Sequence, residues 1–465
     1  MEKGFLRMDA QQIERYFQER RGDHLEELES FLRIPSVSSL SEHKKDMLTA
    51  AEWLVKAFEK AGLENVKIDE TGGHPLVYAD WLHAEGKPTV LVYGHYDVQP
   101  VDPLHLWESP PFEPQVRDNK LYARGASDDK GQTFMHIKAA EALLQLNGEL
   151  PVNMKFIIEG EEEIGSPSLP AYVEKNKEAL EADLIVISDT GMQGPGRPAV
   201  CYGLRGLAGI QIDVKGPKGD LHSGLYGGAV QNPLHAIVEI LESFRDKEGV
   251  IQVEGFYDDV LPVSDKERAE FASLEFDLEN EKKELGITED FGEKEYSFVE
   301  RTWIRPTLEI NGITGGFSGE GIKTVLPAEA SSKITCRLVP NQDPDDIVAK
   351  LKAHVESHKP AGVSVEISEF DKGKPFLTPF DHPAIQAAGR SYEKIYGVPT
   401  AFTRMGGSIP IVAAFDEILE RPVVLMGFGL ASENFHAPNE HFHLENFDKG
   451  LRVICDYLFE ASALK

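Results

Sequence analysis

The feature that most constrains the fold is a series of apolar runs, each followed at once by side chains that can bind metal ions. The run Thr89–Tyr93 leads through a glycine into His95 and Asp97, and the runs Val152–Ile158 and Asp183–Ile187 lead into acidic residues. Segments with helical periodicity separate the runs, and this alternation indicates a mainly parallel sheet. In such a sheet, ligands bind just beyond the carboxyl ends of the strands. We therefore expect the polar groups that follow the runs to converge.

A change of pattern marks a second domain in the middle of the chain. Between residues 207 and 376, strand and helix signals follow in the order β-α-β-β-α-β, interrupted by the highly charged segment Asp265–Glu300. This order is typical of the ferredoxin-like arrangement. The pattern of the first part returns after residue 376. We predict an α/β fold in which residues 1–206 and 377–465 form a metal-binding catalytic domain with flanking helices, and residues 207–376 form an inserted α+β domain.

The composition restricts the partners and the compartment. The formal net charge of −30 over 465 residues opposes binding to nucleic acid or to an anionic membrane. The three cysteines, Cys201, Cys336 and Cys455, form no CxxC pair, which is typical of a reducing compartment. The chain starts without the apolar segment of a signal peptide, and no run approaches the roughly 18 apolar residues of a membrane span. We expect a cytoplasmic protein.

Imidazole and carboxylate groups in these positions suit metal-assisted hydrolysis. Zinc, manganese and cobalt all accept such ligands, and a bound ion lowers the pKa of water and polarises a carbonyl group. Each residue also has a purely structural interpretation. His95 could be a buried turn histidine, Asp128 could be an N-cap, and Asp189 could be a turn residue.

Two choices stay open when spacing alone is considered. The run Glu161–Glu163 follows a strand, and any of its carboxylates could be a ligand, a general base or a solvated strand end. Near the C-terminus, His436 competes with His441 and His443 for the role of an imidazole ligand. We favour His436 because the other two histidines lie beyond the Pro-Asn-Glu turn.

Four motifs together resemble the M20 family of co-catalytic metallopeptidases, and most closely its dipeptidase branch. They are GHYDVQP at residues 94–100, RGASDDKG at 124–131, EExGS at 162–166 and DLHSG at 220–224. The resemblance covers essentially the whole chain. It implies a catalytic domain of the zinc-exopeptidase type, and an inserted ferredoxin-like domain that serves as lid and as dimerisation surface of a homodimer. It also implies two divalent metal ions per subunit, zinc or manganese, with cobalt possible.

The resemblance also assigns roles around the metals. The implied ligands are His95 and Asp189 on the first metal, Glu163 and His436 on the second, and Asp128 between the two. Asp97 would orient the His95 imidazole, and Glu162 would be the general base. Many relatives have a cis peptide bond at the position of Asp128–Asp129.

Four further residues are implied to contact the substrate. His222 resembles a histidine that reaches into the partner subunit's site and stabilises the carbonyl oxyanion. Arg337 resembles an arginine that binds the substrate carboxylate with its bidentate fork. Ser408 could offer donors to the same carboxylate, and Thr324 is a weaker candidate. Without the resemblance, His222 would be a loop histidine, Arg337 a solvated strand arginine and Ser408 a residue of a glycine turn.

The expected activity is that of a di-metal dipeptidase. It would hydrolyse the peptide bond of dipeptides with a free C-terminal carboxylate, by a metal-bridging water that Glu162 activates. The alternative is an amidohydrolase of the same architecture that releases the acyl group of N-acyl amino acids. A non-enzymatic metal-binding protein is expected to lack a ligand or the base, and this sequence lacks neither.

Overall fold

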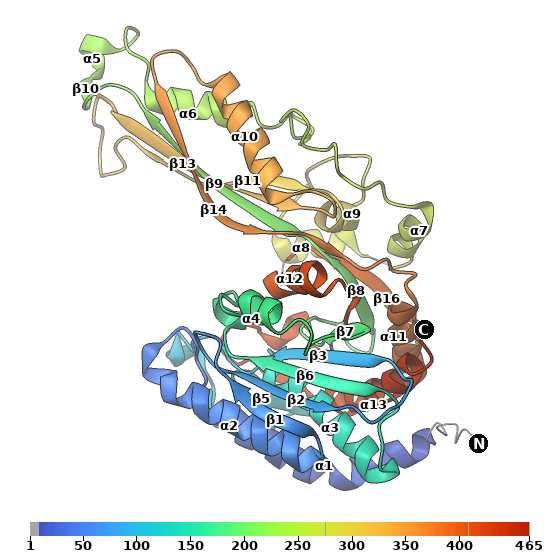
Figure 1. Ribbon diagram of the computed structural model, residues 1–465. Helices are drawn as coiled ribbons and strands as arrows, with labels where there is room; N and C mark the ends of the chain where they lie inside the picture. The colour runs from blue at the N-terminus through green and yellow to red at the C-terminus, as the bar shows by residue number, and fades with distance from the viewer. Residues whose placement is uncertain (1–8, 275, 408, 465) are drawn as a thin grey trace. The chain divides into compact units, whose positions relative to one another are not determined.

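The structure is a computed structural model that describes residues 9–464, apart from residues 275 and 408 (Figure 1). Its contacts divide the chain into two compact units. Unit 1 comprises the described residues of Met1–Tyr202, Thr378–Thr403 and Pro410–Lys465, and unit 2 comprises those of Gly203–Leu377 and Arg404–Ile409. The predicted boundaries leave the last of these segments in the catalytic domain. Its contacts lie with unit 2, where Arg404 forms an ion pair with Glu267.

Unit 1 is built on a mixed sheet whose centre is parallel. Its strand order is β1-β2-β6-β3-β7-β17-β8. β3 is parallel to both β6 and β7, and β17 is parallel to β7, whereas β1, β2 and β8 join antiparallel at the sides. The bounds are β1 Glu64–Asp69, β2 Leu76–Trp81, β3 Thr89–His95, β6 Asn153–Glu159, β7 Leu184–Ile187, β8 Ala199–Leu204 and β17 Val423–Leu425. The predicted α/β class with a mainly parallel sheet is confirmed.

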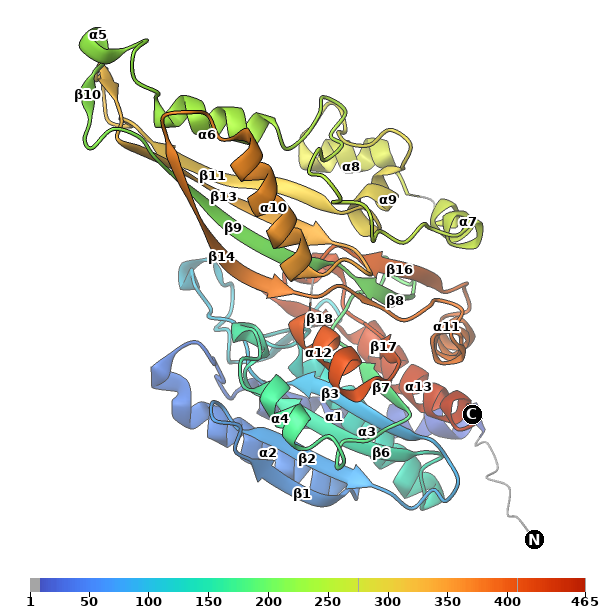
Figure 2. The ribbon, with the colours of Figure 1, turned by 45° about the horizontal axis from the view of Figure 1, so that its top comes forward.

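Helices cover both faces of this sheet (Figures 1 and 2). α1, α2, α3 and α13 pack together on one face, and α4 and α12 pack on the other. α3 is buried on nearly every side over its first fourteen residues, because it lies between the sheet and the neighbouring helices. The bounds are α1 Ala10–Leu32, α2 Lys44–Ala61, α3 Lys130–Asn147, α4 Leu169–Lys175, α11 Pro383–Tyr396, α12 Pro410–Leu419 and α13 Leu444–Ala461.

A small three-stranded sheet fixes the segment near the C-terminus of unit 1. Its order is β18-β5-β4, with bounds β4 Gln115–Arg117, β5 Lys120–Tyr122 and β18 His441–His443. The sequence analysis identified no strand at β18, because three residues are too few for a periodic signal. The remaining short turns of helix in this unit are η1 Ser41–His43, η2 Leu104–Leu106, η3 Glu162–Ile164 and η4 Ala431–Glu433.

Unit 2 contains a four-stranded antiparallel sheet in the order β11-β13-β9-β14. α6 and α10 pack against it, and apolar side chains of β9, such as Ile210 and Ile212, face these helices in a common core. The elements follow the β-α-β-β-α-β order of the ferredoxin-like arrangement. The bounds are β9 Gly206–Lys215, α6 Pro233–Glu242, β11 Thr307–Gly315, β13 Glu329–Leu338, α10 Pro344–His358 and β14 Ser364–Gly373.

The insertion in unit 2 is largely helical. The charged segment that begins at Asp265 forms three short helices, and two of them, α7 and α9, start with capping boxes at Ser264 and Ser297. A hairpin-like extension carries β10, α5 and β12 at one end of the unit (Figure 1). The bounds are β10 Leu221–His222, α5 Ser223–Tyr226, α7 Asp265–Ser273, α8 Leu278–Leu285, α9 Phe298–Trp303 and β12 Val325–Leu326. Two further strands, β15 Phe376–Leu377 and β16 Ala401–Met405, pair with β8.

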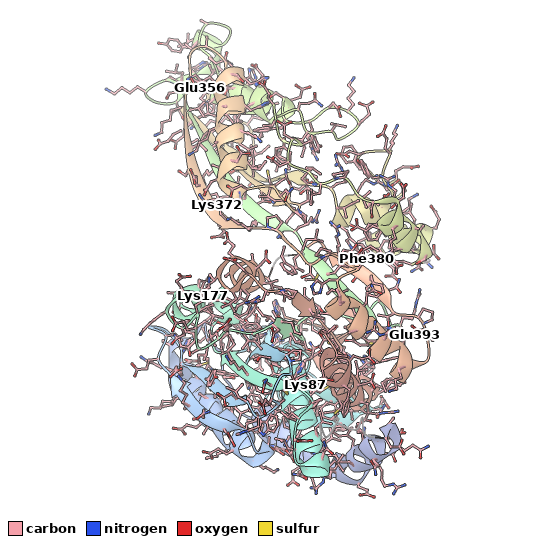
Figure 3. All side chains as sticks on the ribbon, turned by 45° about the vertical axis from the view of Figure 1, so that its right-hand side comes forward. Lys87, Lys177, Glu356, Lys372, Phe380 and Glu393 are labelled. Atoms are coloured by element: carbon pink, nitrogen blue, oxygen red, sulfur yellow. The ribbon has the colours of Figure 1, made fainter. Side chains whose placement is uncertain are left out.

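Charged side chains lie on the outside of both units. Figure 3 shows Lys87 and Lys177 in unit 1 and Glu356 and Lys372 in unit 2 as exposed examples. No helix among the described residues is long and apolar enough to cross a membrane.

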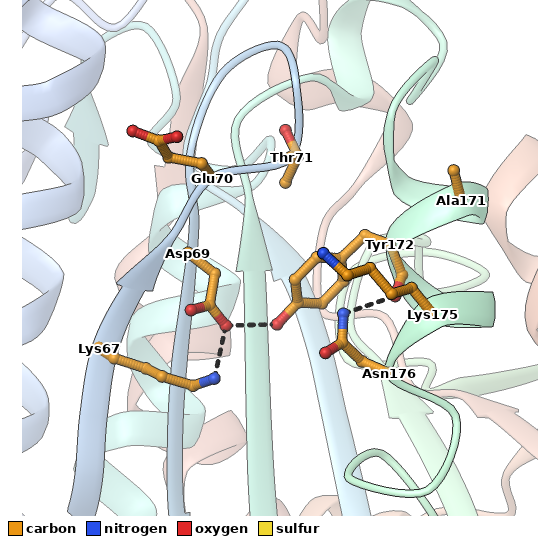
Figure 4. A pocket seen from close by; sticks show the side chains of 8 residues that line it. All are labelled: Lys67, Asp69, Glu70, Thr71, Ala171, Tyr172, Lys175 and Asn176. Atoms are coloured by element: carbon orange, nitrogen blue, oxygen red, sulfur yellow. Dashed lines mark hydrogen bonds and ion pairs between the residues drawn. The ribbon is translucent and has the colours of Figure 1, made fainter.

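A polar pocket of about 240 Å³ lies between β1 and α4 (Figure 4). At its floor, the Tyr172 hydroxyl donates to Asp69 (2.6 Å), and Lys67 forms an ion pair with the same carboxylate (2.7 Å). Burial and the Asp69 carboxylate raise the pKa of Tyr172 above its ordinary value, so this hydroxyl stays protonated. The pocket therefore marks a contact that holds β1 to α4.

The two faces of α2 give a direct test of this packing. Leu54 is fully buried, whereas Leu48 in the same helix is 47% exposed. We expect Leu54→Ala to lower the free energy of unfolding of unit 1 by about 2–5 kcal/mol, because it leaves a cavity. Leu48→Ala is the matched control and should cost less than about 1 kcal/mol. Urea unfolding followed by circular dichroism measures both, and equal losses would contradict the packing described here.

Candidate metal centre

Five segments of unit 1 bring metal-binding side chains to the carboxyl edge of the sheet. His95 is the last residue of β3, and Asp189 follows the end of β7 by two residues. Glu163 lies in η3, just after β6, and Asp128 precedes α3. His436 lies in the irregular segment between η4 and β18. Because β3, β6 and β7 are parallel neighbours, their carboxyl ends meet at one place.

Asp128 lies between the two histidines. Its Oδ1 is 3.3 Å from His95 Nε2, and its Oδ2 is 2.9 Å from His436 Nε2. Asp189 Oδ2 lies 3.9 Å from His95 Nε2, and Glu163 Oε2 lies 3.2 Å from His436 Nε2. The Asp128–Asp129 peptide bond is cis. Each oxygen of one carboxylate thus faces a different imidazole, which is the arrangement of a ligand shared by two ions.

Within the described residues, two groups of side chains have the geometry to hold an ion. One group is His95, Glu162 and Asp189, and the other is Asp128, Glu163 and His436. In each group the donor atoms lie within 4.8 Å of one another.

The donor chemistry fits two divalent ions. His95 Nε2 is buried, and its 3.3 Å contact with Asp128 Oδ1 does not have the geometry of a hydrogen bond, although an imidazole nitrogen in that position would normally be satisfied. Imidazole and carboxylate donors suit zinc and manganese. The residues present therefore fit the metals that the sequence predicted.

Asp97 joins the histidine to the acidic loop. Its carboxylate is buried and lies 3.4 Å from His95 Nδ1. It also accepts hydrogen bonds from the backbone N–H groups of Glu162 (3.2 Å) and Glu163 (3.0 Å). The sequence suggested the contact of Asp97 with His95. The hydrogen bonds from the backbone of Glu162 and Glu163 depend on the turn after β6, and the residue spacing gave no sign of them.

The structure separates the three consecutive glutamates. Glu161 is buried, and its carboxylate accepts from the backbone N–H groups of His74 (2.9 Å) and Ser168 (3.2 Å). Glu162 and Glu163 turn toward the cluster of imidazoles instead. Gln99 donates to Glu163 Oε2 (2.7 Å), a contact that the sequence analysis missed although Gln99 belongs to a quoted motif.

The competing histidines have other partners. His441 in β18 packs against Tyr122 with ring centroids 4.8 Å apart and the rings tilted by 31°, and its Nδ1 lies 3.0 Å from the Asn439 carbonyl. His443 Nδ1 lies 2.7 Å from a Glu433 oxygen. His436 alone of the three contacts both Asp128 and Glu163 among the described residues.

Closely spaced, partly buried carboxylates dominate the electrostatics. Burial raises the pKa of Glu162 to about 7, and the neighbouring Glu163 and Asp128 carboxylates add to the shift while His95 opposes it. Burial and Asp128 raise the pKa of Asp189 well above its ordinary value. Hydrogen bonds to Asp128 and Glu163 raise the pKa of His436 to about 10. Carboxylates this close together in a buried site favour the presence of cations.

The residues predicted to bind substrate lie in unit 2, except Ser408, which lies outside the described residues. His222 in β10 and Thr324 are neighbours, because Ser223 N donates to the Thr324 carbonyl (3.0 Å). Gly224 N donates to His222 Nδ1 (3.0 Å). Arg337 lies on β13, opposite Leu207 of β9.

Comparisons with known proteins all match this chain to metallopeptidases. The model of "Peptidase family M20/M25/M40" matches residues 91–460. The chain is 31% identical to the Cys-Gly metallodipeptidase dug1 of Schizosaccharomyces pombe over 99% of this chain and 100% of that one. It is 33% identical to the Beta-Ala-His dipeptidase of Homo sapiens, covering 84% of this chain and 78% of that one. The crystal structure of the M20 family metallo-carboxypeptidase Sso-CP2 from Sulfolobus solfataricus superposes with a TM-score of 0.82 at 35% identity, covering 95% and 99% of the two chains.

Removing one carboxylate oxygen should test the shared ligand. We expect Asp128→Asn to lower the affinity for divalent zinc or manganese at least tenfold, because the amide nitrogen cannot bind a cation. Isothermal titration of chelator-stripped protein measures this affinity. The control is Asp448→Asn, which removes a carboxylate of α13 that pairs with Arg21 (2.9 Å) away from the cluster. Metal binding by Asp128→Asn that equals the control would contradict the assignment.

Proposed function

The chain belongs to peptidase family M20/M25/M40 and is a metallopeptidase, and from this premise we propose that it is a di-metal dipeptidase that cleaves dipeptides with a free C-terminal carboxylate. The observation that carries the proposal is the position of Asp128 between His95 and His436, each 3.3 Å or less from one of its oxygens. A single carboxylate in that position suits a pair of ions better than one ion.

We assign the metal ligands as follows. His95 and Asp189 would hold one ion, Glu163 and His436 would hold the other, and Asp128 would serve both. The ions would be zinc or manganese, with cobalt as a further option, because these metals accept the same donors. When bound, they lower the pKa of water and polarise the scissile carbonyl.

Glu162 acts as the general base in this proposal. Its backbone N–H donates to the Asp97 carboxylate, and its side chain lies beside His95 and Asp189, where a general base for the attacking water is needed. Glu162 takes a proton from the attacking water, the hydroxide oxygen bonds to the carbonyl carbon, and the C–N bond breaks. The proton passes from Glu162 to the leaving amine, so that two amino acids are released.

Residues of unit 2 bind the substrate in the same proposal. Because Gly224 N donates to His222 Nδ1, the proton of the neutral ring resides on Nε2, which suits a donor to a carbonyl oxyanion. Arg337 binds the substrate carboxylate with its two parallel N–H groups. Ser408 adds donors to that carboxylate, and Thr324 contributes a weaker contact beside His222.

A homodimer formed through unit 2 is also part of the proposal. The extension that carries His222 exposes apolar side chains to an unusual extent, with Ile322 93% and Leu225 75% exposed, and with Tyr226 and Phe317 exposed nearby. Apolar groups gathered in this way favour a protein partner over solvent. A second copy of this chain as that partner would place one subunit's His222 at the other subunit's substrate.

The names of the relatives and the cysteines bear on the substrates and the compartment. The Cys-Gly metallodipeptidase and the Beta-Ala-His dipeptidase suggest Cys-Gly and β-Ala-His as dipeptides to test on this chain. We propose the cytoplasm as the compartment, supported by the buried thiols of Cys336 and Cys455. The strongly negative net charge opposes nucleic acid as a partner.

The base assignment predicts a sharp difference between neighbouring glutamates. We expect Glu162→Gln to reduce kcat on Cys-Gly or Ala-Ala by about 10²–10⁴-fold or more, with metal content unchanged, because only proton transfer is lost. Glu161→Gln is the matched control, since that side chain serves backbone amides, and it should retain most of its turnover. The same assays on N-acetyl amino acids distinguish the alternative activity, which would be favoured if only these were cleaved.

Mixing two inactive variants tests whether His222 acts across the dimer. His222→Ala and Glu162→Gln homodimers should each be nearly inactive. If His222 serves the partner subunit, a hybrid dimer contains one site with both groups intact, and mixed subunits should regain up to about one quarter of the wild-type turnover. Subunit exchange followed by a dipeptide assay measures this recovery. A mixture as inactive as its components would show that His222 acts within its own subunit or has no catalytic role.

A further inference from the structure

Two buried glutamates flank His436 in the sequence without belonging to the proposed ligand set. Glu433 precedes His436 by three residues and Glu440 follows it by four, and both side chains are fully buried. Burying a carboxylate is costly unless it is hydrogen-bonded or paired. Their partners therefore indicate what the two side chains do.

Glu440 holds the turn that carries Asp128. Its Oε1 accepts from the backbone N–H groups of Ser127 (3.0 Å) and Asp128 (3.1 Å). Its Oε2 accepts from Gly125 N (2.9 Å) and from Arg124 Nη1 (2.8 Å). One carboxylate thus fixes three backbone amides of the segment that leads into α3.

Glu433 holds the same turn from the other side. Its Oε2 accepts from Ser127 Oγ (2.6 Å) and from Leu430 N (2.9 Å). Its Oε1 accepts from His443 N (2.9 Å) and lies 2.7 Å from His443 Nδ1. The segment around His436 is therefore tied to Ser127 and Asp128 at two points, one before and one after the histidine.

These contacts join Asp128, Glu440 and His436 in a ring at the candidate metal centre. Asp128 N donates a hydrogen bond to Glu440, and a short stretch of chain connects Glu440 to His436. His436 Nε2 in turn lies 2.9 Å from Asp128 Oδ2. His436 has no strand or helix of its own and adopts a positive φ of 56°. By contrast, His95 ends a central strand and is held by the sheet ladder.

We propose that Glu440, supported by Glu433, is a positioning residue that sets the place of His436 relative to Asp128 and so raises the metal affinity of the site that contains His436. This inference rests on the proposed di-metal function. Because His95 is positioned by the sheet, loss of Glu440 weakens the site of His436 more than the site of His95. Partners that orient metal ligands typically change metal affinity 10–100-fold.

The alternative role of Glu440 is to balance the buried charge of Arg124. The guanidinium also donates to the Pro100 carbonyl (3.1 Å), and it lies 5.4 Å from the centre of the Trp107 ring. A pure charge-balancing role predicts lower stability with no difference between the two metal sites. The two roles therefore differ in metal affinity.

The test measures zinc binding by metal-stripped protein, in competition with a chromophoric chelator, in two backgrounds that each leave one site. In His95→Ala, which leaves the site of His436, adding Glu440→Gln should weaken zinc binding at least tenfold. In His436→Ala, which leaves the site of His95, the same change should weaken zinc binding by a several-fold smaller factor, because only the shared Asp128 loses its support there. The amide nitrogen of glutamine cannot accept from the backbone N–H groups, and this loss causes the effect.

The matched control is Glu27→Gln. Glu27 is a partly buried glutamate of α1, and it forms ion pairs with Lys138 (2.8 Å) and Lys60 (2.7 Å) away from the centre. It should lower the Tm of the metal-free protein without affecting zinc binding in either background. Equal effects of Glu440→Gln in the two backgrounds, or effects no larger than those of Glu27→Gln, would overturn the proposal.

A smaller variant keeps the test decisive if Glu440→Gln does not fold. Ser127→Ala removes only the hydroxyl that donates to Glu433, and it should weaken zinc binding in His95→Ala more than in His436→Ala. The absence of that difference would overturn the proposal as well. If the unmodified protein binds fewer than two equivalents of zinc, the di-metal function itself is wrong, and this inference falls with it. Two equivalents in that protein with no selective effect of the variants would refute the inference alone.

Discussion

Closely spaced, partly buried negative charge at the carboxyl edge of a parallel sheet is the constraint on which the rest of this structure depends. Asp128, Glu162, Glu163 and Asp189 lie within a few ångströms of two imidazoles, and burial makes the ionised carboxylates unfavourable on their own. Divalent cations are the simplest compensation for such a group of charges. The fold of unit 1 therefore gathers side chains that suit metal ions, and this agrees with the peptidase family to which the chain belongs.

The two imidazoles of the centre are positioned in different ways, one by the sheet and one by a loop. β3 and β6 are parallel and in register from Thr89 opposite Asn153 to His95 opposite Glu159, so one half of the centre is fixed by a continuous ladder of hydrogen bonds. The other half depends on irregular chain near His436. Side chains compensate there, because Glu433 and Glu440 replace the missing ladder with hydrogen bonds to the turn before α3. A strand end thus positions His95, and buried carboxylates position the segment of His436.

Much of this arrangement could be predicted because the relevant signals are local. The run Thr89–Tyr93 predicted a strand, and the structure has that strand with two further residues, Gly94 and His95. The ligand and base assignments stay predictions, but the five predicted ligand side chains lie together in unit 1. Glu440 escaped notice because a glutamate after an asparagine looks like a solvated residue, and its partners are more than 300 positions away in the sequence. β18 escaped notice because three residues carry no period.

The sequence by itself determined the α/β class, the family and the residue types available for metal chemistry, because apolar periodicity and short motifs are properties of neighbouring residues. Only the tertiary structure decided which of three adjacent glutamates serves backbone amides, and which of three nearby histidines meets Asp128. Those choices depend on the direction in which each side chain leaves a turn. That direction is set by hydrogen bonds between distant parts of the chain, such as those that the Asp97 and Glu440 carboxylates accept, which no local pattern records.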